Sequence, residues 1–258
     1  MKISDCTALV TGANRGLGKV FVEELCADGA RRVYASARDV TKLEPLVQRY
    51  PDQVIPIALD VANHAQVLEA AQQCGDVDLL INNAGALADA GPISAADLDA
   101  GRELFEVNFW GMVACCRAFA PILKANGGGT IVNILSNLAL VSIPYQGFYC
   151  ASKAAGWSVT HAIRAELEPQ GTLVVACLPD AFETDMVAYI DGTKMSPVVI
   201  ARACIDAVAN EQEDLFGPAV GDPLGWSVRF RTEPKEVERE GAKISAAHVR
   251  RKQRKRAR

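Results

Sequence analysis

The sequence has few of the residues that mark metal-binding, disulfide-linked or membrane-spanning proteins. Its 258 residues include only three histidines, none paired at metal-ligand spacing, and its eight cysteines contain no C-x-x-C pair. A structural zinc site normally needs such spacings, so we predict no metal centre. No segment approaches the roughly 20 uninterrupted apolar residues of a membrane helix, so we predict no membrane span.

The start of the chain has no features of a secretory signal, because Met1 and Lys2 lead directly into a predicted strand. We therefore expect a reducing, cytoplasmic location without disulfides. Most cysteines fall in predicted strands and helices, where a free thiol packs as a small hydrophobe: these are Cys6, Cys26, Cys115, Cys116, Cys177 and Cys204. Redox activity of the adjacent Cys115 and Cys116 is the less favoured alternative.

The net charge of −4 hides an uneven distribution. The last ten residues contain seven Lys or Arg and no acid, whereas the rest of the chain carries 20 basic and 31 acidic side chains. We expect the basic tail, residues 241–258, to be disordered and solvated beyond a catalytic domain at residues 1–240. Its charge admits contact with nucleic acid or an anionic membrane, but a solubilising end is the favoured interpretation.

Short β-branched runs alternate with longer helical segments along the chain, and half of the residues are apolar. This alternation predicts an α/β fold, with a parallel sheet covered by helices on both faces. We predict one long helix over 97–124, a helix opening at Tyr149 and a last helix over Pro197–Ala209. Strands are expected at Cys6–Thr11, Arg32–Ser36, Val54–Leu59, Val77–Ile81, Thr130–Leu135, Thr172–Leu178 and Leu215–Phe216. From Asp222 onward the pattern predicts no particular structure.

A glycine-rich turn follows the first strand, with Gly12, Gly16 and Gly18 in the spacing G-x-x-x-G-x-G. Glycines let the backbone turn sharply, and the N–H groups at the start of the next helix can bind a pyrophosphate. The second strand ends at Ala37-Arg38, where an NAD site usually has an acid. Arg15 and Arg38 together suit a 2′-phosphate, so NADP(H) is the favoured cofactor and NAD(H) the alternative. Asp39, one residue further on, complicates this assignment slightly.

Polar residues also follow the next two strands. Asp60, at the end of the third, is placed to accept from an adenine amino group. Asn82-Asn83-Ala84-Gly85, after the fourth, has amides that can brace strand and cofactor together, although such a tetrapeptide alone is more often a turn. Asn108 lies inside the long helix, where a buried amide needs partners. It either bonds a local carbonyl group or holds a water near the active site.

The stretch from Thr130 to Lys153 contains the candidate catalytic groups. Tyr149 and Lys153 are four residues apart and share one helix face. An ammonium beside a phenol favours the phenolate, so the pair predicts a tuned proton donor. Ser136 ends a strand, at the edge where open α/β sheets bind ligands, and supplies a hydroxyl donor for a carbonyl oxygen. By itself a Tyr-x-x-x-Lys pair is more often an ordinary helix pair.

These motifs, in this order over residues 3–217, resemble the short-chain dehydrogenases/reductases, in their compact branch of about 250 residues. The resemblance implies a single-domain Rossmann fold with a doubly wound seven-stranded parallel sheet. It implies that Asn108, Ser136, Tyr149 and Lys153 form a catalytic tetrad. The cofactor is then expected to contact Gly12, Asn14, Arg15, Gly16, Leu17, Gly18, Arg38, Asp60, Val61, Asn83, Ala84, Gly85, Tyr149, Lys153, Pro179 and Thr184. The family commonly forms dimers or tetramers, here through the helices around 97–124 and 149–168.

Two positions depart from the family pattern. Asp180 follows Pro179 where glycine is usual, and we hypothesise that its carboxylate either turns outward or favours the oxidised nicotinamide ring. Leu135 replaces a second serine, which matters little because Ser136 keeps its spacing to Tyr149.

The expected activity is NADP(H)-dependent interconversion of a ketone or aldehyde and its alcohol. Apolar residues predict a lipophilic or small carbonyl substrate, with Ser136, Leu138, Tyr145, Phe182 and Met186 as candidate contacts and residues 182–196 as a lid. A β-ketoacyl thioester reductase is the closest enzyme alternative, but its acidic carrier needs a basic patch that the body lacks. A non-catalytic NADP(H)-sensing protein is the alternative from another class, and the intact tetrad argues against it.

Overall fold

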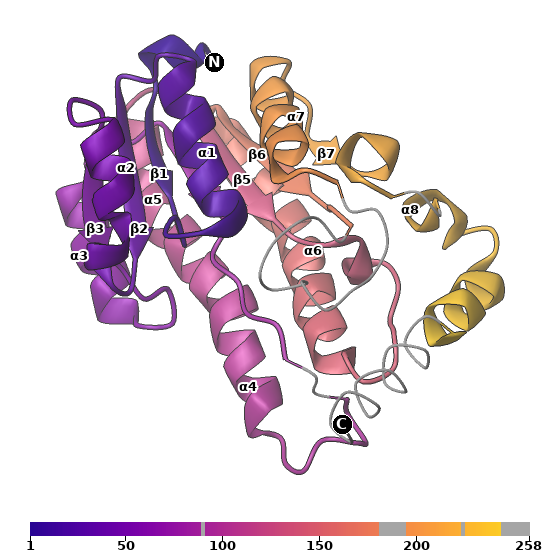
Figure 1. Ribbon diagram of the computed structural model, residues 1–258. Coiled ribbons are helices and arrows are strands. Elements are labelled where there is room, and N and C mark those ends of the chain that lie inside the picture. Colours follow the sequence, from indigo (N-terminus) through magenta and orange to yellow (C-terminus); the bar gives the residue numbers. More distant parts are fainter. Residues whose placement is uncertain (89–90, 181–194, 223–224, 244–258) are drawn as a thin grey trace.

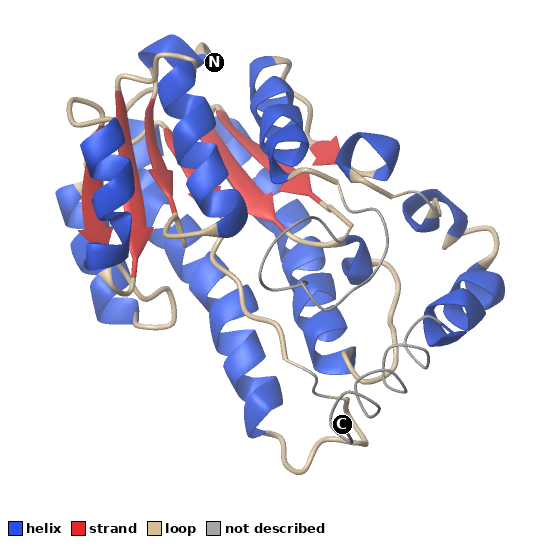
Figure 2. Ribbon diagram, in the orientation of Figure 1, coloured by secondary structure: helices blue, strands red, loops and turns tan. Residues whose placement is uncertain are grey.

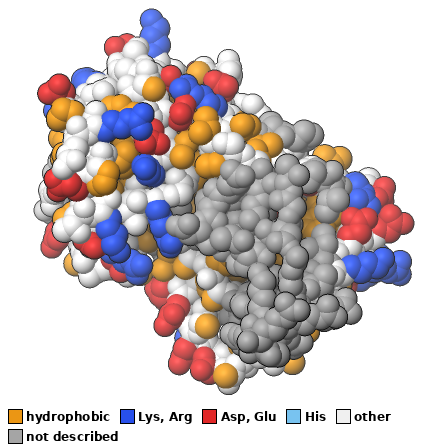
Figure 3. Space-filling model, in the orientation of Figure 1, with side chains coloured by type: hydrophobic (Ala, Val, Ile, Leu, Met, Phe, Trp, Pro, Cys, Tyr) orange, Lys and Arg blue, Asp and Glu red, His pale blue; other side chains and the backbone are white. Residues whose placement is uncertain are grey.

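A computed structural model describes residues 1–88, 91–180, 195–222 and 225–243. Within this part of the chain, helices cover both faces of one sheet (Figure 1, Figure 2). Several predictions lie outside it, among the residues drawn in grey in Figure 3: the basic tail from residue 244 onward, residues 182–194 of the expected lid, and Phe182, Thr184 and Met186. No helix in the described ranges is both long enough and apolar enough to cross a membrane.

The sheet has seven strands in the order β3-β2-β1-β4-β5-β6-β7, and every neighbouring pair is parallel. This arrangement confirms the predicted doubly wound Rossmann sheet. The strands are β1 (Thr7–Val10), β2 (Arg32–Ala37), β3 (Val54–Ala58), β4 (Leu79–Asn82), β5 (Gly129–Ile134), β6 (Thr172–Cys177) and β7 (Asp214–Leu215). The chain reverses its direction across the sheet between β1 and β4, and such a switch point is where open sheets bind ligands.

The helices alternate with the strands along the chain, as βαβ connections require. They are α1 (Gly16–Ala27), α2 (Glu44–Arg49), α3 (His64–Gln73), α4 (Asp99–Phe105), α5 (Met112–Ala125), α6 (Gly147–Leu167), α7 (Pro197–Ala209) and α8 (Trp226–Arg229). Residues 234–243 are helical as well.

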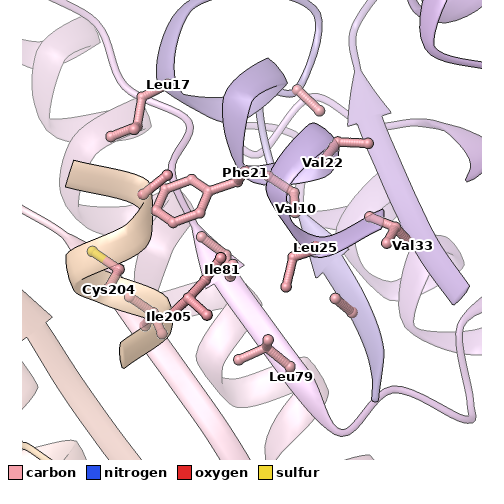
Figure 4. Packing of buried hydrophobic residues seen from close by; sticks show 14 of the residues in the cluster. Val10, Leu17, Phe21, Val22, Leu25, Val33, Leu79, Ile81, Cys204 and Ile205 are labelled. Carbon is pink, nitrogen blue, oxygen red and sulfur yellow. The ribbon is translucent and has the colours of Figure 1, made fainter. Parts of the chain in front are cut away.

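The sheet carries a core on each face because successive side chains of a strand point to opposite sides. Ala8 and Val10 pack with α1 and α7, whereas Leu9 packs with α3 and α5 on the other face. In Figure 4, side chains of α1 and α7 point toward the β4 residues Leu79 and Ile81. All eight cysteines are buried free thiols, as their apolar surroundings indicated.

The predicted helix over 97–124 is interrupted. It begins at Asp99, and between α4 and α5 the backbone forms a π-helical segment, η3 (Glu106–Gly111). Asn108 lies inside this segment. Single π turns recur at functional sites, and propensity does not reveal them because they depend on tertiary partners.

Other boundaries differ by one or two residues. Helix α6 begins at Gly147 rather than Tyr149, so Tyr149 lies within the first turn instead of opening the helix. The strand expected at Thr130–Leu135 runs from Gly129 to Ile134 as β5. The last strand is Asp214–Leu215 rather than Leu215–Phe216.

Candidate active site

Three loops meet at the carboxyl edge of the sheet around the switch point. The glycine-rich turn leaves β1, the Asn83 segment leaves β4, and the segment beginning at Leu135 leaves β5, so their polar groups share one edge. Helix α6 brings Tyr149 and Lys153 to the same edge, since the ammonium of Lys153 reaches the carbonyl oxygen of Ile134 at the end of β5.

Thr11 and Asn83 hold the glycine-rich turn against the end of β4. The Thr11 hydroxyl accepts from the backbone N–H groups of Asn83 and Ala84, both at 2.9 Å. The Asn83 amide in return donates to the carbonyl oxygens of Thr11 at 2.8 Å and Gly12 at 3.3 Å. The predicted bracing role of Asn83 toward the strands is therefore present.

The glycines at the turn are required by close approach. A Cβ on Gly18 would lie 2.3 Å from the Gly12 carbonyl oxygen. Gly12 has φ +66°, and a Cβ added there would lie 3.0 Å from the Ala84 Cα. Helix α1 begins at Gly16 after an extended Arg15, whose side chain does not cap the helix. The first N–H groups of α1 thus lie beside glycine backbone at Gly12, Gly16 and Gly18, and this arrangement fits a pyrophosphate.

The end of β2 has no acid facing this turn. Ala37 is buried there, and Arg38 is exposed, as is Arg15 at the start of α1. The Asp39 carboxylate bonds a neighbouring residue, since it accepts from the hydroxyl of Thr41 at 2.6 Å and from the Thr41 N–H at 3.1 Å. These bonds lower the pKa of the Asp39 carboxyl. The acid that complicated the cofactor assignment is therefore the cap of a short helix.

The other residues predicted to contact the cofactor differ in burial and in whether their side chains can reach a ligand. Leu17 is buried in the core with Phe21, so only its backbone can face a cofactor (Figure 4). Asp60, half-buried after β3, accepts from the Ala62 N–H at 3.1 Å. Val61 is buried against Gly111, where an added Cβ would lie 2.8 Å from its methyl group. Asn14 is half-buried in the turn.

Ser136 caps a short 3-10 turn, η4 (Asn137–Ala139), just beyond β5. Its hydroxyl oxygen accepts from the Leu138 N–H at 3.1 Å and lies 3.4 Å from the amide oxygen of Asn137. The side chain is buried, and its position is set by the turn rather than by the strand, because β5 ends at Ile134.

Lys153 is buried in α6 and donates to the Ile134 carbonyl oxygen at 2.9 Å. Burial lowers its pKa to about 8, because the ammonium is removed from water. At neutral pH the group is therefore still mainly protonated. Its nitrogen lies 5.9 Å from the centre of the Tyr149 ring, which confirms that the two side chains share a helix face.

Asn108 makes three hydrogen bonds. Its amide oxygen accepts from the Ala86 N–H at 2.8 Å, while its nitrogen donates to the Ala86 carbonyl at 2.9 Å and to the Ser152 hydroxyl at 3.1 Å. Ser152 in turn donates to the carbonyl of Tyr149 at 2.7 Å. The carbonyl that Asn108 bonds belongs to Ala86, 22 residues away, rather than to a local residue of the helix, and the water-holding role stays a prediction. Together with the bond to Ser152, this contact links the loop after β4 to α6.

A Cβ on Gly85 would lie 3.4 Å from the Asn108 amide oxygen and 3.7 Å from the Lys153 nitrogen. Gly85 therefore lies next to both side chains, and the absence of its own side chain leaves this surface uncovered. The structure thus brings Asn108, Lys153 and the loop after β4 together, and their roles in a tetrad stay a prediction.

Pro179 and Asp180 follow β6. The Pro179 carbonyl accepts from the Asn137 N–H at 2.9 Å, and the Asp180 N–H donates to the Val220 carbonyl at 3.1 Å. Asp180 is half-buried and does not have a positive φ, so its backbone accepts an ordinary side chain in place of the usual glycine. Its preference for one redox form of a cofactor stays a prediction.

The candidate substrate residues within the described part of the chain are Leu138 and Tyr145, besides Ser136 described above. Leu138 is partly buried, and Tyr145 is 42% exposed with φ +67°, a strained value for an aromatic residue. A cavity of about 470 Å³ lies between the segment after β5 and the C-terminal helices, and its lining includes Leu140, Val141, Ile143, Phe230 and Val237. Its wall includes neither candidate, so their contact with substrate stays a prediction.

The groups that contact the candidate tetrad from outside were not predicted from the motifs. Asn137 and the backbone carbonyl of Ile134 contact catalytic candidates, and Ser152 links Asn108 to the helix of Tyr149. For Ser152 the sequence gives only a weak indication of this role, namely its position directly before Lys153 on the predicted helix. A backbone carbonyl has no signal in the sequence.

Comparison with known proteins gives a consistent family. A family profile described as short chain dehydrogenase matches residues 6–194. The short-chain dehydrogenase PC-15 of Penicillium crustosum is 36% identical over 187 residues, which span 69% of this chain and 66% of that protein.

Two solved structures cover nearly the whole chain. A short-chain dehydrogenase from Burkholderia cenocepacia in complex with NADP has a TM-score of 0.83 and 35% identity, over 92% of this chain and 99% of that one. A short-chain dehydrogenase/reductase from Burkholderia phymatum in complex with NAD has a TM-score of 0.81 and 25% identity, over 92% and 96%. The fold, the switch-point site and these matches agree: the chain belongs to the short-chain dehydrogenase/reductase family, whose members are nicotinamide-dependent oxidoreductases.

Proposed function

We propose that this protein is an NADP(H)-dependent carbonyl reductase that interconverts a lipophilic ketone or aldehyde and its alcohol. The observation that carries the proposal is the buried Lys153 ammonium, held by Ile134 beside Tyr149 at the edge that also carries the glycine turn. A buried amine with a lowered pKa next to a phenol is typical of a proton-transfer site.

A bound nicotinamide nucleotide supplies the hydride. In the reducing direction Tyr149 donates its phenolic proton to the carbonyl oxygen, and it takes that proton back from the alcohol in the oxidising direction. Ser136 donates a hydrogen bond to the same oxygen and stabilises the charge that develops on it. The Lys153 ammonium favours the phenolate that Tyr149 leaves behind. Asn108 holds α6 against the loop after β4, which keeps these groups in register.

NADP(H) is the proposed cofactor. Ala37 replaces the acid that would repel a 2′-phosphate, Asp39 is engaged by Thr41, and the exposed Arg15 and Arg38 supply two guanidinium forks. The NADP complex of the Burkholderia cenocepacia relative supports the same assignment.

A cytoplasmic homo-oligomer is part of the proposal. Eight reduced, buried thiols suit a reducing compartment. Trp110 on η3 is 55% exposed, and the rings of Trp157 and His161 on α6 meet edge to face with centroids 4.2 Å apart. These aromatics lie on the two helices expected to form the subunit contact, and large exposed aromatics are enriched at interfaces.

The test is the loss of NADPH absorbance with a panel of aliphatic, aromatic and steroidal ketones. We expect turnover with apolar ketones, its loss in Tyr149→Phe, and unchanged NADPH binding by that variant in a fluorescence titration. Absence of turnover across the panel by a protein that binds NADPH would instead favour the sensing alternative. Cofactor affinities of Asp180→Gly test the remaining hypothesis, since an unchanged ratio of NADP⁺ to NADPH affinity would refute a role for its carboxylate.

A further inference from the structure

Asn137, the residue after the catalytic serine, is unusually constrained. Its side chain is 1% exposed. Its backbone N–H donates to the Pro179 carbonyl and its carbonyl accepts from the Leu140 N–H, both at 2.9 Å. These bonds fix the backbone of Asn137 between the ends of β5 and β6, and its side-chain amide lies directly beside the Ser136 hydroxyl.

The Ser136 hydroxyl has one proton and two lone pairs to distribute. It accepts from the Leu138 N–H at 3.1 Å, and its proton can be directed at the Asn137 amide oxygen at 3.4 Å. That distance is at the long end for a hydrogen bond. While the proton points there, it is not available to a substrate carbonyl oxygen.

The other end of the same amide is buried without a partner. The Asn137 nitrogen has no hydrogen-bond acceptor within the described residues, and such unpaired groups are uncommon in native proteins because they cost stability. A leucine of similar size would fill the position without this cost. The presence of an amide here therefore points to a use for its polarity.

Rotation of the amide by half a turn would exchange its two ends. In both orientations one end of the Asn137 amide bonds the Ser136 hydroxyl and the other end has no partner. The number of hydrogen bonds that the amide makes is therefore the same in both orientations. With the nitrogen toward Ser136, the hydroxyl oxygen accepts from two N–H groups and its proton turns away from Asn137. Accepting such bonds also strengthens the hydroxyl as a donor.

We propose that Asn137 is a positioning residue that controls the direction of the Ser136 proton. The amide oxygen holds the proton in the resting site, and the amide nitrogen replaces it when a carbonyl oxygen binds. This inference rests on the proposed function, because it requires Ser136 to donate to a substrate oxygen. It requires no new covalent step.

The test is steady-state kinetics with NADPH and the best ketone of the panel, on Asn137→Leu, Asn137→Asp, Ser136→Ala and the Ser136→Ala/Asn137→Leu double variant. We expect Asn137→Leu to fold at least as stably as wild type and to lower kcat roughly three- to tenfold, with the KM for NADPH unchanged. Asn137→Asp, an acceptor only, should lower kcat further. Asn137→Ala repeats the measurement without added bulk if the leucine variant fails to fold.

The double variant separates positioning from structure. If Asn137 acts through Ser136, its substitution has no further effect on kcat when Ser136 is already alanine. An equal fall in both backgrounds, or an unchanged kcat in Asn137→Leu, would overturn the inference. Absence of turnover by the wild-type protein would refute the proposed function and this inference with it, whereas an active wild type with an indifferent Asn137 would refute the inference alone.

Discussion

The side-chain nitrogen of Lys153 donates to the backbone carbonyl oxygen of Ile134 at 2.9 Å. This one bond joins α6, which carries Tyr149, to the last residue of β5, two residues before Ser136. A contact between a helix and a strand thus ties the helix of Tyr149 to the strand that precedes Ser136, and its donor is a buried amine.

Burial of Lys153 predicts a specific dependence of stability on pH. Its pKa falls from 10.5 to about 8 in the folded protein, so between these values the unfolded chain binds more protons. The free energy of unfolding therefore rises with pH across that window. The cost of burying the Lys153 ammonium is fully present below about pH 8 and disappears as the amine loses its proton. A shift of this size corresponds to something on the order of 3 kcal/mol.

Urea unfolding of the cofactor-free protein and of Lys153→Met, at pH 7 to 10.5, measures this effect. We expect the variant to be the more stable at pH 7 and the difference to shrink as pH rises. Buried thiols such as Cys6 and Cys74, with pKa values raised to about 12, give the opposite slope, but they are common to both proteins. A difference that stays constant with pH would contradict the prediction.

Replacement of Arg38 should change the cofactor preference. We expect Arg38→Ala to weaken NADPH binding about ten- to a hundredfold, because one charge-assisted contact to the 2′-phosphate is lost. NADH binding should hardly change. Arg31→Ala is the matched control, since Arg31 flanks the opposite end of β2 and donates to Thr7 instead. Equal losses for both nucleotides, measured by fluorescence titration, would count against a 2′-phosphate site.

Gly18→Ala should abolish cofactor binding and destabilise the fold by roughly 1–3 kcal/mol. The added Cβ would lie 2.3 Å from the Gly12 carbonyl oxygen and 2.5 Å from the Asn83 amide, so the turn has to move. Gly75→Ala is the control, because a Cβ there meets nothing within 4 Å. Thermal unfolding with and without NADPH distinguishes the two variants. A normal cofactor-induced rise in Tm for Gly18→Ala would refute a pyrophosphate site at the glycine-rich turn.

Trp110→Glu should dissociate the proposed oligomer. The indole is 55% exposed on η3 and packs against Phe109 with ring centres 4.7 Å apart. A charge at the centre of an apolar contact is costly to bury. Light scattering after gel filtration should show a smaller particle for this variant and no change for Leu68→Glu, which alters a 45% exposed residue of α3. A wild-type monomer would remove the basis of the prediction.

Most of the fold was predictable because it depends on local periodicity. Strands buried on both faces, such as Ala8-Leu9-Val10, appear in the sequence as short continuous apolar runs. The glycines of the turn mark positions where the backbone leaves no room for a side chain. The π segment at Asn108 was not predictable, since it is stabilised by Ala86 and Ser152, which lie 22 and 44 residues away.

The sequence by itself determined which groups are present and at which edge of the sheet they gather, because strand order and the carboxyl ends follow from the alternation of strands and helices. Only the tertiary structure decided how those groups are held. Desolvation of Lys153, the capping role of Asp39 and the unpaired amide of Asn137 arise from packing between segments distant in the chain or from the local path of the backbone. Hydrogen bonding and burial depend on those three-dimensional neighbours, which residue spacing alone does not specify.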